Sequence, residues 1–278
     1  MTFSLLQSLE RTLDHLTKKI RYQLIEMSHF GKAPHLGSSL SCVDLVTLAY
    51  NQFLKIDPRN PTADNRDRFI LSKGHAITTL YAVLAFHDFF PKKWLKDFNQ
   101  DGKSLPEHPT PKCVPGVELA SGSLGHGLSV GVGHALAAKI RKMNYKVMVL
   151  LSDGECNEGS TWEGAMFAPK HHLSNLCAIV DFNKWQATGR SEDILSLSPL
   201  REKWESFGWK AYEIDGHNFS QILDTFAAIK EEKKLPSVII ANTIKGKGID
   251  FMEDDNNWHY RIPNSEELQK CKKILGLP

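Results

Sequence analysis

A carboxylate and an amide follow two apolar runs near the middle of the chain, where together they could bind a divalent cation. Residues 147–151 are entirely apolar and precede Asp153, and the apolar residues 176–180 precede Asn183. Both runs are typical of buried strands. A right-handed crossover between them brings Asp153 and Asn183 to the same edge of a parallel sheet. Their oxygens suit a hard divalent cation, which commonly takes its other ligands from substrate phosphates.

The residue after Asp153 favours a bound phosphate. Gly154 has no Cβ, so a phosphate can approach the backbone closely. A helix expected over residues 160–171 adds an N-terminus that attracts anions. A plain Asp-Gly turn explains the same residues without any ligand, and on the residues alone both interpretations stay open.

Four histidines lie in segments where imidazoles can act on a ligand. His35 lies in a Gly- and Pro-containing loop, His75 at a strand-to-helix turn, His108 between two prolines, and His259 in a loop near the C-terminus. Neutral imidazoles can move protons near pH 7. A solvated loop histidine is the alternative for His35, and a helix-capping histidine for His75.

A glycine-rich segment lies between His108 and the central strands. Residues 122–127 contain three glycines, which permit close approach of the backbone to a planar or charged ligand. A flexible loop without a ligand is the alternative. Small residues in the helix expected over residues 128–140 allow tight packing, and a subunit interface is one use of such a face.

Composition excludes several classes of protein. The 278 residues are 41% hydrophobic and 24% charged, with a formal net charge of +2, so the chain has no basic surface for nucleic acid. Five scattered cysteines form no C-x-x-C pair, which argues against structural zinc and a disulfide framework. Charges interrupt the N-terminal residues from Glu10 onward and no apolar run approaches about 20 residues, so we expect neither a signal peptide nor a membrane-spanning segment. We expect a cytoplasmic protein without nucleic-acid or membrane partners.

Apolar periodicity predicts alternating strands and helices along the whole chain, and hence one α/β domain over residues 1–278 with a mostly parallel sheet flanked by helices. Ser41 is expected to cap a helix, and Asn264 or Ser265 the last one. The expected strands are residues 68–72, 147–151, 176–180, 210–214 and 237–243. The expected helices are residues 5–30, 76–86, 128–140, 160–171, 219–229 and 266–275.

In order along the chain, these motifs resemble the N-terminal, diphosphate-binding half of transketolases. The resemblance spans residues 5–263 and centres on Asp153 and Asn183, which are similar to the thiamine diphosphate motif. The other matching segments are residues 31–40, 68–75, 106–109, 122–127 and 245–248, with Trp258-His259. Three positions depart from the family pattern, namely Ser152 for Gly, Lys73 for Asn and His126 for Gln. Lys73 adds charge near the implied diphosphate or substrate.

The resemblance implies a role for each site residue. Mg²⁺, with Ca²⁺ or Mn²⁺ as alternatives, is bound by the Asp153 and Asn183 side chains and the backbone carbonyl of Trp185. The family further implies that the diphosphate contacts Gly154, His75 and His259, and that the aminopyrimidine contacts the backbone of Gly122, Ser123 and Leu124. The implied thiazolium and sugar site is lined by His35, His75, His108 and His259. Glu158 is implied to be a carboxylate at the dimer contact.

The implied activity is transfer of a two-carbon ketol unit from a ketose phosphate to an aldose phosphate. Transketolases carry two further domains, one with the glutamate that activates the aminopyrimidine, and residues 1–278 include neither. We therefore expect a split enzyme whose C-terminal subunit is a separate chain, in a two-plus-two assembly. One alternative is half of a deoxyxylulose-phosphate synthase-like enzyme that uses pyruvate and releases CO₂. Another is a non-catalytic paralogue. A metal-dependent phosphatase would need more carboxylates than Asp153 and Asp181.

Overall fold

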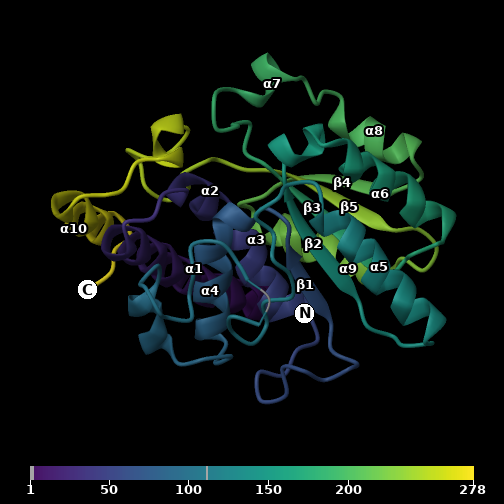
Figure 1. The fold of residues 1–278 in the computed structure, drawn as a ribbon, viewed down its shortest axis with the longest axis horizontal. Helices are drawn as coiled ribbons and strands as arrows, with labels where there is room; N and C mark the ends of the chain where they lie inside the picture. The colour runs from purple at the N-terminus through teal and green to yellow at the C-terminus, as the bar shows by residue number, and fades with distance from the viewer. Residues whose placement is uncertain (1–2, 111) are drawn as a thin grey trace.

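The computed structural model describes residues 3–110 and 112–278, and in them a five-stranded sheet carries the fold (Figure 1). The strand order is β1-β2-β3-β5-β4, and every neighbouring pair is parallel. This confirms the expected α/β class, with a sheet that is wholly parallel. The strands are β1 (Arg68–Leu71), β2 (Val147–Ser152), β3 (Leu176–Phe182), β4 (Lys210–Asp215) and β5 (Ser237–Asn242).

The central strands are apolar on both faces because each face packs against its own core. In β2, Met148 and Leu150 belong to one hydrophobic core, and Val147, Val149 and Leu151 belong to the other. Successive side chains of a strand point to opposite faces of the sheet. A continuous apolar run is therefore what a strand covered by helices on both sides requires.

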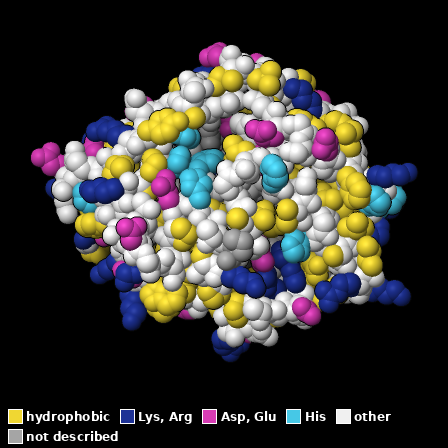
Figure 2. All heavy atoms as spheres, viewed as in Figure 1, with side chains coloured by type: hydrophobic (Ala, Val, Ile, Leu, Met, Phe, Trp, Pro, Cys, Tyr) yellow, Lys and Arg dark blue, Asp and Glu magenta, His cyan; other side chains and the backbone are white. Residues whose placement is uncertain are grey.

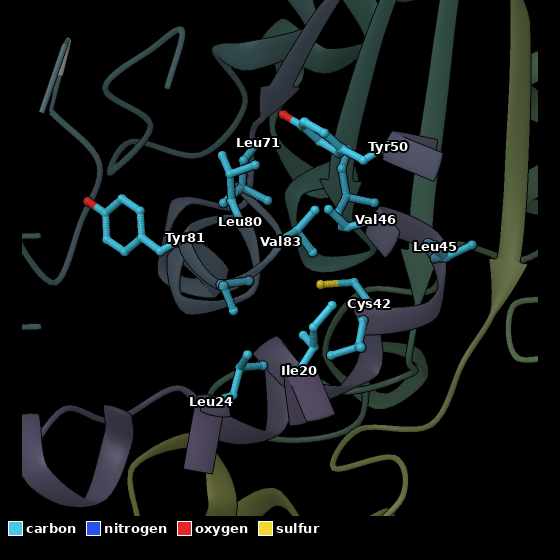
Figure 3. Close-up of a cluster of buried hydrophobic side chains, with 14 of the residues drawn as sticks. Ile20, Leu24, Cys42, Leu45, Val46, Tyr50, Leu71, Leu80, Tyr81 and Val83 are labelled. Atoms are coloured by element: carbon cyan, nitrogen blue, oxygen red, sulfur yellow. The ribbon is translucent and has the colours of Figure 1, made fainter. Parts of the chain in front are cut away.

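Helices cover the two faces of the sheet in separate groups (Figure 1). One group contributes to the larger core, where α1, α3 and α4 pack around side chains such as Ile20, Leu45 and Leu80 (Figure 3). That group comprises α1 (Phe3–Gly31), α2 (Leu36–Ser41), α3 (Val43–Leu48), α4 (Ile77–Phe86), α9 (Phe219–Glu231) and α10 (Ser265–Ile274). The second group comprises α5 (Gly127–Ile140), α6 (Gly159–Lys170) and α8 (Leu200–Ser206).

Short helical turns occupy the loops between these elements. They are the π-helical turn η1 (Ala49–Phe53), the 3₁₀ turns η2 (Gly74–Ala76), η3 (Lys92–Asp97), η4 (Gly154–Asn157) and η5 (Asn256–His259), and the short helix α7 (Ser191–Ile194). Three of them, η2, η4 and η5, lie directly beside the histidine and carboxylate motifs. Within the described part of the chain, no helix is both long and apolar enough to cross a membrane.

Of the two expected helix caps, one is confirmed and one is wrong. The Asn264 side chain accepts a hydrogen bond from the Glu267 backbone N–H, and the Glu267 carboxylate accepts one from the Asn264 backbone N–H, so α10 begins with a capping box. Ser41 instead ends α2, and its hydroxyl donates to the Ser38 carbonyl and to Asp181 Oδ2 at 2.6 Å. Ser41 is thus committed to a buried polar network.

Candidate active site

Loops that follow four strands place polar side chains at one edge of the sheet. Lys73 follows β1, Asp153 follows β2, Asn183 follows β3, and Lys245 follows β5. Parallel strands put their carboxyl ends on the same edge, which is where α/β proteins bind ligands. Histidine side chains gather beside a hollow on the face of the molecule that Figure 2 shows.

Asp153 is fully buried and held in place by three donors. Oδ1 accepts from the Gly154 N–H at 2.9 Å, and Oδ2 accepts from the Lys184 N–H at 2.9 Å and from Ser191 Oγ at 2.7 Å. Burial raises the pKa of Asp153 to about 6, although the hydrogen bonds from Ser191 and Gly154 oppose the shift. The structure therefore fixes this carboxylate rigidly at the end of β2.

Asn183 lies on the loop that Asp153 contacts. Its Oδ1 accepts from the Trp185 N–H at 3.1 Å, and its Nδ2 lies 3.5 Å from Asp181 Oδ2. Lys184, between them, has a left-handed φ of 68°, which turns the chain so that its N–H meets Asp153. The tight turn after β3 thus brings Lys184, which lies between Asn183 and Trp185, into contact with Asp153.

The four predicted histidines form one cluster around His35. Its ring centroid lies 5.0 Å from that of His259, 5.5 Å from that of His75 and 5.8 Å from that of His108. His35 itself has a left-handed φ of 68°, and its N–H donates to the His259 carbonyl at 2.8 Å. Side chains from four segments that are far apart in sequence therefore meet in one cluster.

The pKa values of three clustered histidines, His35, His75 and His259, are lowered, which favours their neutral forms at physiological pH. Burial, with the nearby His108 and Lys245, lowers the pKa of His35 to about 4. Burial and Lys245 lower the pKa of His259 to about 3, and burial together with Lys73 holds the pKa of His75 well below its usual value. The Nδ1 atom of His35 is buried without a hydrogen-bond partner among the described residues, as expected of a group that binds a ligand.

The glycine-rich segment lies beside this cluster. A Cβ on Gly122 would be 4.0 Å from His108 Cδ2, while Ser123 and Leu124 stay at least partly accessible. The N–H of Gly125 donates to Glu155 Oε1 at 2.8 Å, which anchors the segment to the loop after β2. His126, the departure from the family pattern, is exposed, with Nδ1 2.9 Å from the Leu124 carbonyl oxygen.

Lys245 belongs to this site, although its sequence context predicted no individual role for it. Its ammonium is buried, donates to Asn256 Oδ1 at 2.7 Å and lies 3.1 Å from His259 Nδ1. Burial, with repulsion from Lys73, lowers the pKa of Lys245 to about 8. A buried ammonium that no carboxylate of the described residues pairs with is a binding group for an anion. Its position in the loop that follows β5 is the sequence signal that could identify it.

Lys73 has a different environment. Its buried ammonium forms an ion pair with Asp181 and donates to the Ser38 carbonyl at 2.9 Å. Ser41 and Thr243 also donate to Asp181. Asp181 therefore offsets the charge that Lys73 adds near the site, and the pair is part of the support behind the histidine cluster.

A second carboxylate beside Asp153 has no counterpart among the predicted site residues. Glu155 is fully buried, accepts from Ser72 Oγ, the Gly125 N–H and the Ser152 N–H, and has a pKa raised by burial. The Ser152 hydroxyl accepts from the Glu155 N–H at 3.2 Å. Ser152 stands where the family pattern has Gly, so its side chain adds a hydrogen bond to this turn. Glu155 ties the ends of β1 and β2 to the glycine-rich segment.

Glu158, unlike these buried groups, is exposed to solvent. It is exposed at the N-terminus of α6, and its side chain caps no helix N–H. A Cβ on Gly125, whose φ is 81°, would lie 2.6 Å from the Glu158 Cβ. Its exposure in the single chain is compatible with the expected contact to another subunit.

The residues at this edge fit a hard cation together with a diphosphate. Asp153 and Asn183 offer side-chain oxygens, which hard cations prefer. Lys245 offers a buried positive charge, and His35 Nδ1, which has no hydrogen-bond partner among the described residues and lies 3.7 Å from Glu107 Oε1, belongs to the same cluster. A Cβ on Gly154 would lie 3.1 Å from Gln186 Cγ, so a side chain there would crowd the turn between Asp153 and the 183–190 loop.

Comparison with known proteins identifies the family of the chain. Residues 14–278 match the family model described as "Transketolase, thiamine diphosphate binding domain". The fold and the site thus define a thiamine diphosphate-binding domain. Specifically, the chain belongs to the transketolase family, as its sequence motifs indicate.

Individual relatives narrow this assignment. The chain is 40% identical to a subunit of an apulose-4-phosphate transketolase from Phocaeicola vulgatus, over 95% of this chain and 94% of that protein. It is 41% identical to "6-deoxy-6-sulfo-D-fructose transketolase subunit SqwG" from a Clostridium species, over 93% and 94% of the two chains. The chain is therefore an N-terminal transketolase subunit of the two-chain type.

A solved full-length enzyme shows how much of the family architecture the chain covers. The transketolase of Campylobacter jejuni superposes with a TM-score of 0.89 at 31% identity, over 96% of this chain and 43% of the Campylobacter chain. This chain thus corresponds to less than half of a single-chain transketolase.

Proposed function

We propose that this chain holds Mg²⁺ and the diphosphate of thiamine diphosphate at the sheet edge described above. Asp153, Asn183 and the Trp185 carbonyl bind the cation. The diphosphate meets Gly154, His75, His259 and, on the evidence of its buried charge, Lys245. The convergence of Lys245 and His259, 3.1 Å apart, on the edge that carries Asp153 is the observation that supports this most strongly.

The rest of the cofactor site uses the neighbouring segments. The backbone of Gly122, Ser123 and Leu124 lies against the aminopyrimidine, and His35, His75, His108 and His259 surround the thiazolium and the sugar. When bound, thiamine diphosphate supplies a nucleophilic carbon that attacks the ketose carbonyl. The lowered pKa values of His35, His75 and His259 favour their neutral forms near pH 7, and a neutral imidazole can accept or donate protons at the sugar hydroxyls.

The reaction is transfer of a two-carbon ketol unit between a ketose phosphate and an aldose phosphate. A separate C-terminal subunit completes the active site, and two copies of each chain form the assembly, with Glu158 at the contact between copies of this chain. Residues 1–278 form one domain, and the protein acts in the cytoplasm. The names of the relatives refer to apulose 4-phosphate and to a sulfonated deoxyfructose, which supports ketose derivatives as the substrate class.

Ketol transfer from a ketose phosphate donor, with thiamine diphosphate and Mg²⁺, tests this proposal. The assay compares this chain alone with this chain plus the product of a neighbouring reading frame that resembles the missing half. We expect activity only in the mixture, and loss of that activity in Asp153→Ala. Full activity from the chain alone would overturn the split active site.

Two further arms separate the alternatives. Pyruvate as donor, with CO₂ release, would indicate the deoxyxylulose-phosphate synthase-like reaction in place of ketol transfer. Calorimetric titration of the mixture with thiamine diphosphate shows whether the cofactor binds at all. Absence of binding would contradict the proposal and favour a non-catalytic subunit.

A further inference from the structure

A buried polar network outside the histidine cluster joins three elements that are distant in sequence. Asp44 of α3 accepts from Arg21 Nη2 of α1 at 2.7 Å and from His217 Nδ1, after β4, at 2.8 Å. Arg21 and Asp44 are 5% and 3% exposed, and the His217 side chain is 10% exposed. We call Arg21, Asp44 and His217 the Asp44 network.

The Asp44 network holds the segment that carries Lys245 on both sides. His217 Nε2 accepts from the Ile244 N–H at 2.9 Å, one residue before Lys245. Arg21 Nε donates to the Lys247 carbonyl at 3.0 Å, two residues after it. Gly248, with a φ of 95°, allows this approach, because a Cβ there would lie 2.7 Å from Arg21 Cδ.

Asp44 also determines which nitrogen of His217 can accept. Because a carboxylate only accepts, His217 Nδ1 carries the proton, which leaves Nε2 free to accept from Ile244. Burial opposes ionisation of Asp44, but Arg21 and His217 hold its pKa below the usual value. Asp44 is therefore a charged acceptor that aligns both of the side chains holding the Lys245 segment.

We propose that Arg21, Asp44 and His217 are positioning residues that fix the Lys245 ammonium in the diphosphate site. This inference rests on the proposed cofactor site, because Lys245 needs an anion to bind. None of the three residues belongs to the histidine cluster or the metal loop, so their effect on the cofactor passes through the 244–248 backbone. Loss of the hydrogen bonds to the 244–248 backbone lets Lys245 move and weakens cofactor binding, while the positions of the clustered histidines do not change.

Two substitutions of His217 separate its two hydrogen bonds. In His217→Gln, the amide oxygen can take the place of Nε2 and accept from Ile244. In His217→Asn, the amide N–H can take the place of Nδ1 and donate to Asp44, but nothing reaches Ile244. We expect His217→Asn to raise the Kd for thiamine diphosphate about tenfold, as loss of one hydrogen bond implies. The Kd of His217→Gln should stay within about threefold of wild type, because this variant retains the hydrogen bond from the Ile244 N–H.

The experiment is calorimetric titration of this chain, assembled with its partner chain, with thiamine diphosphate in saturating Mg²⁺. Ketol-transfer kcat at saturating cofactor is measured in parallel and should change little in His217→Asn. If that variant fails to fold, Arg21→Lys serves instead, because it removes the Nε–H that holds the Lys247 carbonyl.

A double-mutant cycle with Lys245→Ala distinguishes positioning from general destabilisation. Once Lys245 is absent, His217→Asn should weaken cofactor binding no further. Additive losses, or equal Kd values for His217→Asn, His217→Gln and wild type, would overturn the inference. Failure of wild type to bind thiamine diphosphate would instead contradict the proposed function, so the two failures are distinguishable.

Discussion

Nδ1 of His259 lies 3.1 Å from the ammonium of Lys245, and both residues are buried. An ammonium only donates hydrogen bonds, so Nδ1 of His259 accepts and its ring proton lies on Nε2. Lys245 therefore sets the tautomer of a histidine in the proposed sugar site. Because the Lys245 ammonium is buried, its charge is stabilised when an anion binds beside it.

The pH dependence of cofactor binding should report this buried charge. The pKa of Lys245 is lowered to about 8, so the free protein loses the ammonium proton as the pH rises through 8. Diphosphate binds the protonated form, and its affinity should fall by up to about tenfold per pH unit above that value. Calorimetric titration with thiamine diphosphate from about pH 6.5 to about pH 9.5 measures the effect.

Lys245→Arg is the matched control for this titration. A guanidinium stays protonated throughout the range, so the fall above pH 8 should disappear even if the affinity at neutral pH is lower. An equally steep fall in this variant would assign the titration to a different group.

In the unliganded chain, the lowered pKa of Lys245 means that the unfolded state binds more protons than the folded state between about pH 8 and 10.5, so the free energy of unfolding rises with pH in that range.

The buried pair of Lys73 and Asp181 should be costly to break from one side. Asp181→Asn leaves a fully buried ammonium without its counter-charge. We expect the free energy of unfolding to fall by about 3–5 kcal/mol. Urea denaturation of the purified chain, followed by tryptophan fluorescence, measures this loss.

An exposed pair provides the comparison for Asp181→Asn. Asp254 accepts two hydrogen bonds from Arg190, each at 2.6 Å, but both side chains are over a third exposed. Asp254→Asn should therefore cost no more than about 1 kcal/mol. Similar losses for both variants would show that burial does not determine the stability contributed by these pairs.

The sequence predicts the strands well because burial on both faces leaves a direct trace. The apolar runs at residues 147–151 and 176–180 each lie within the observed strands β2 and β3. Asp153 and Asn183 could be placed at one sheet edge for the same reason, since chain order and crossover handedness determine where the ends of parallel strands meet. The four histidines, by contrast, were brought together only by resemblance to a family.

Side-chain contacts between distant segments leave no periodic signal. Glu155 resembles any acidic loop residue in sequence, but it bonds to Ser72, 83 positions away. The sequence around Asp44 likewise gives no sign of its partner His217, which is 173 positions away. Such pairs depend on how the helices pack on the sheet, which local propensity and hydrophobic pattern do not specify.

Gly74 should tolerate no side chain, because the glycine-rich segment packs directly on it. A Cβ at this position would lie 2.1 Å from the Ser121 carbonyl oxygen. Gly74→Ala should lower the free energy of unfolding by about 1–3 kcal/mol, as overpacking does, and weaken binding of thiamine diphosphate by displacing residues 121–125. Urea denaturation and calorimetric titration measure the two effects.

Gly133 is the control for Gly74. It lies inside α5 with open space around its Cβ position. Gly133→Ala should stabilise the chain by about 0.5–1 kcal/mol, because alanine is the better helix former. Destabilisation by both alanines would mean that the Ser121 contact is not the cause of the loss at Gly74.

The same Glu→Gln substitution should change the stability of the chain at Glu155 but not at Glu158, three residues later. Both carboxylate oxygens of Glu155 accept backbone N–H groups, from Gly125 at 2.8 Å and from Ser152 at 3.2 Å. In Glu155→Gln, the amide nitrogen must face one of these donors. The free energy of unfolding should fall by about 1–3 kcal/mol, the cost of leaving buried groups unpaired.

Glu158→Gln should leave the stability of the isolated chain within about 0.5 kcal/mol of wild type, because this side chain is exposed. If Glu158 lies at the contact between copies, its substitution acts on assembly instead. Sedimentation velocity of the assembled enzyme should then show a weaker complex for Glu158→Gln at the same protein concentration. Unchanged assembly of the Glu158→Gln variant would show that Glu158 does not lie at the contact.

For Glu155→Gln, a stability equal to that of wild type would contradict the support that Glu155 gives to the glycine-rich segment.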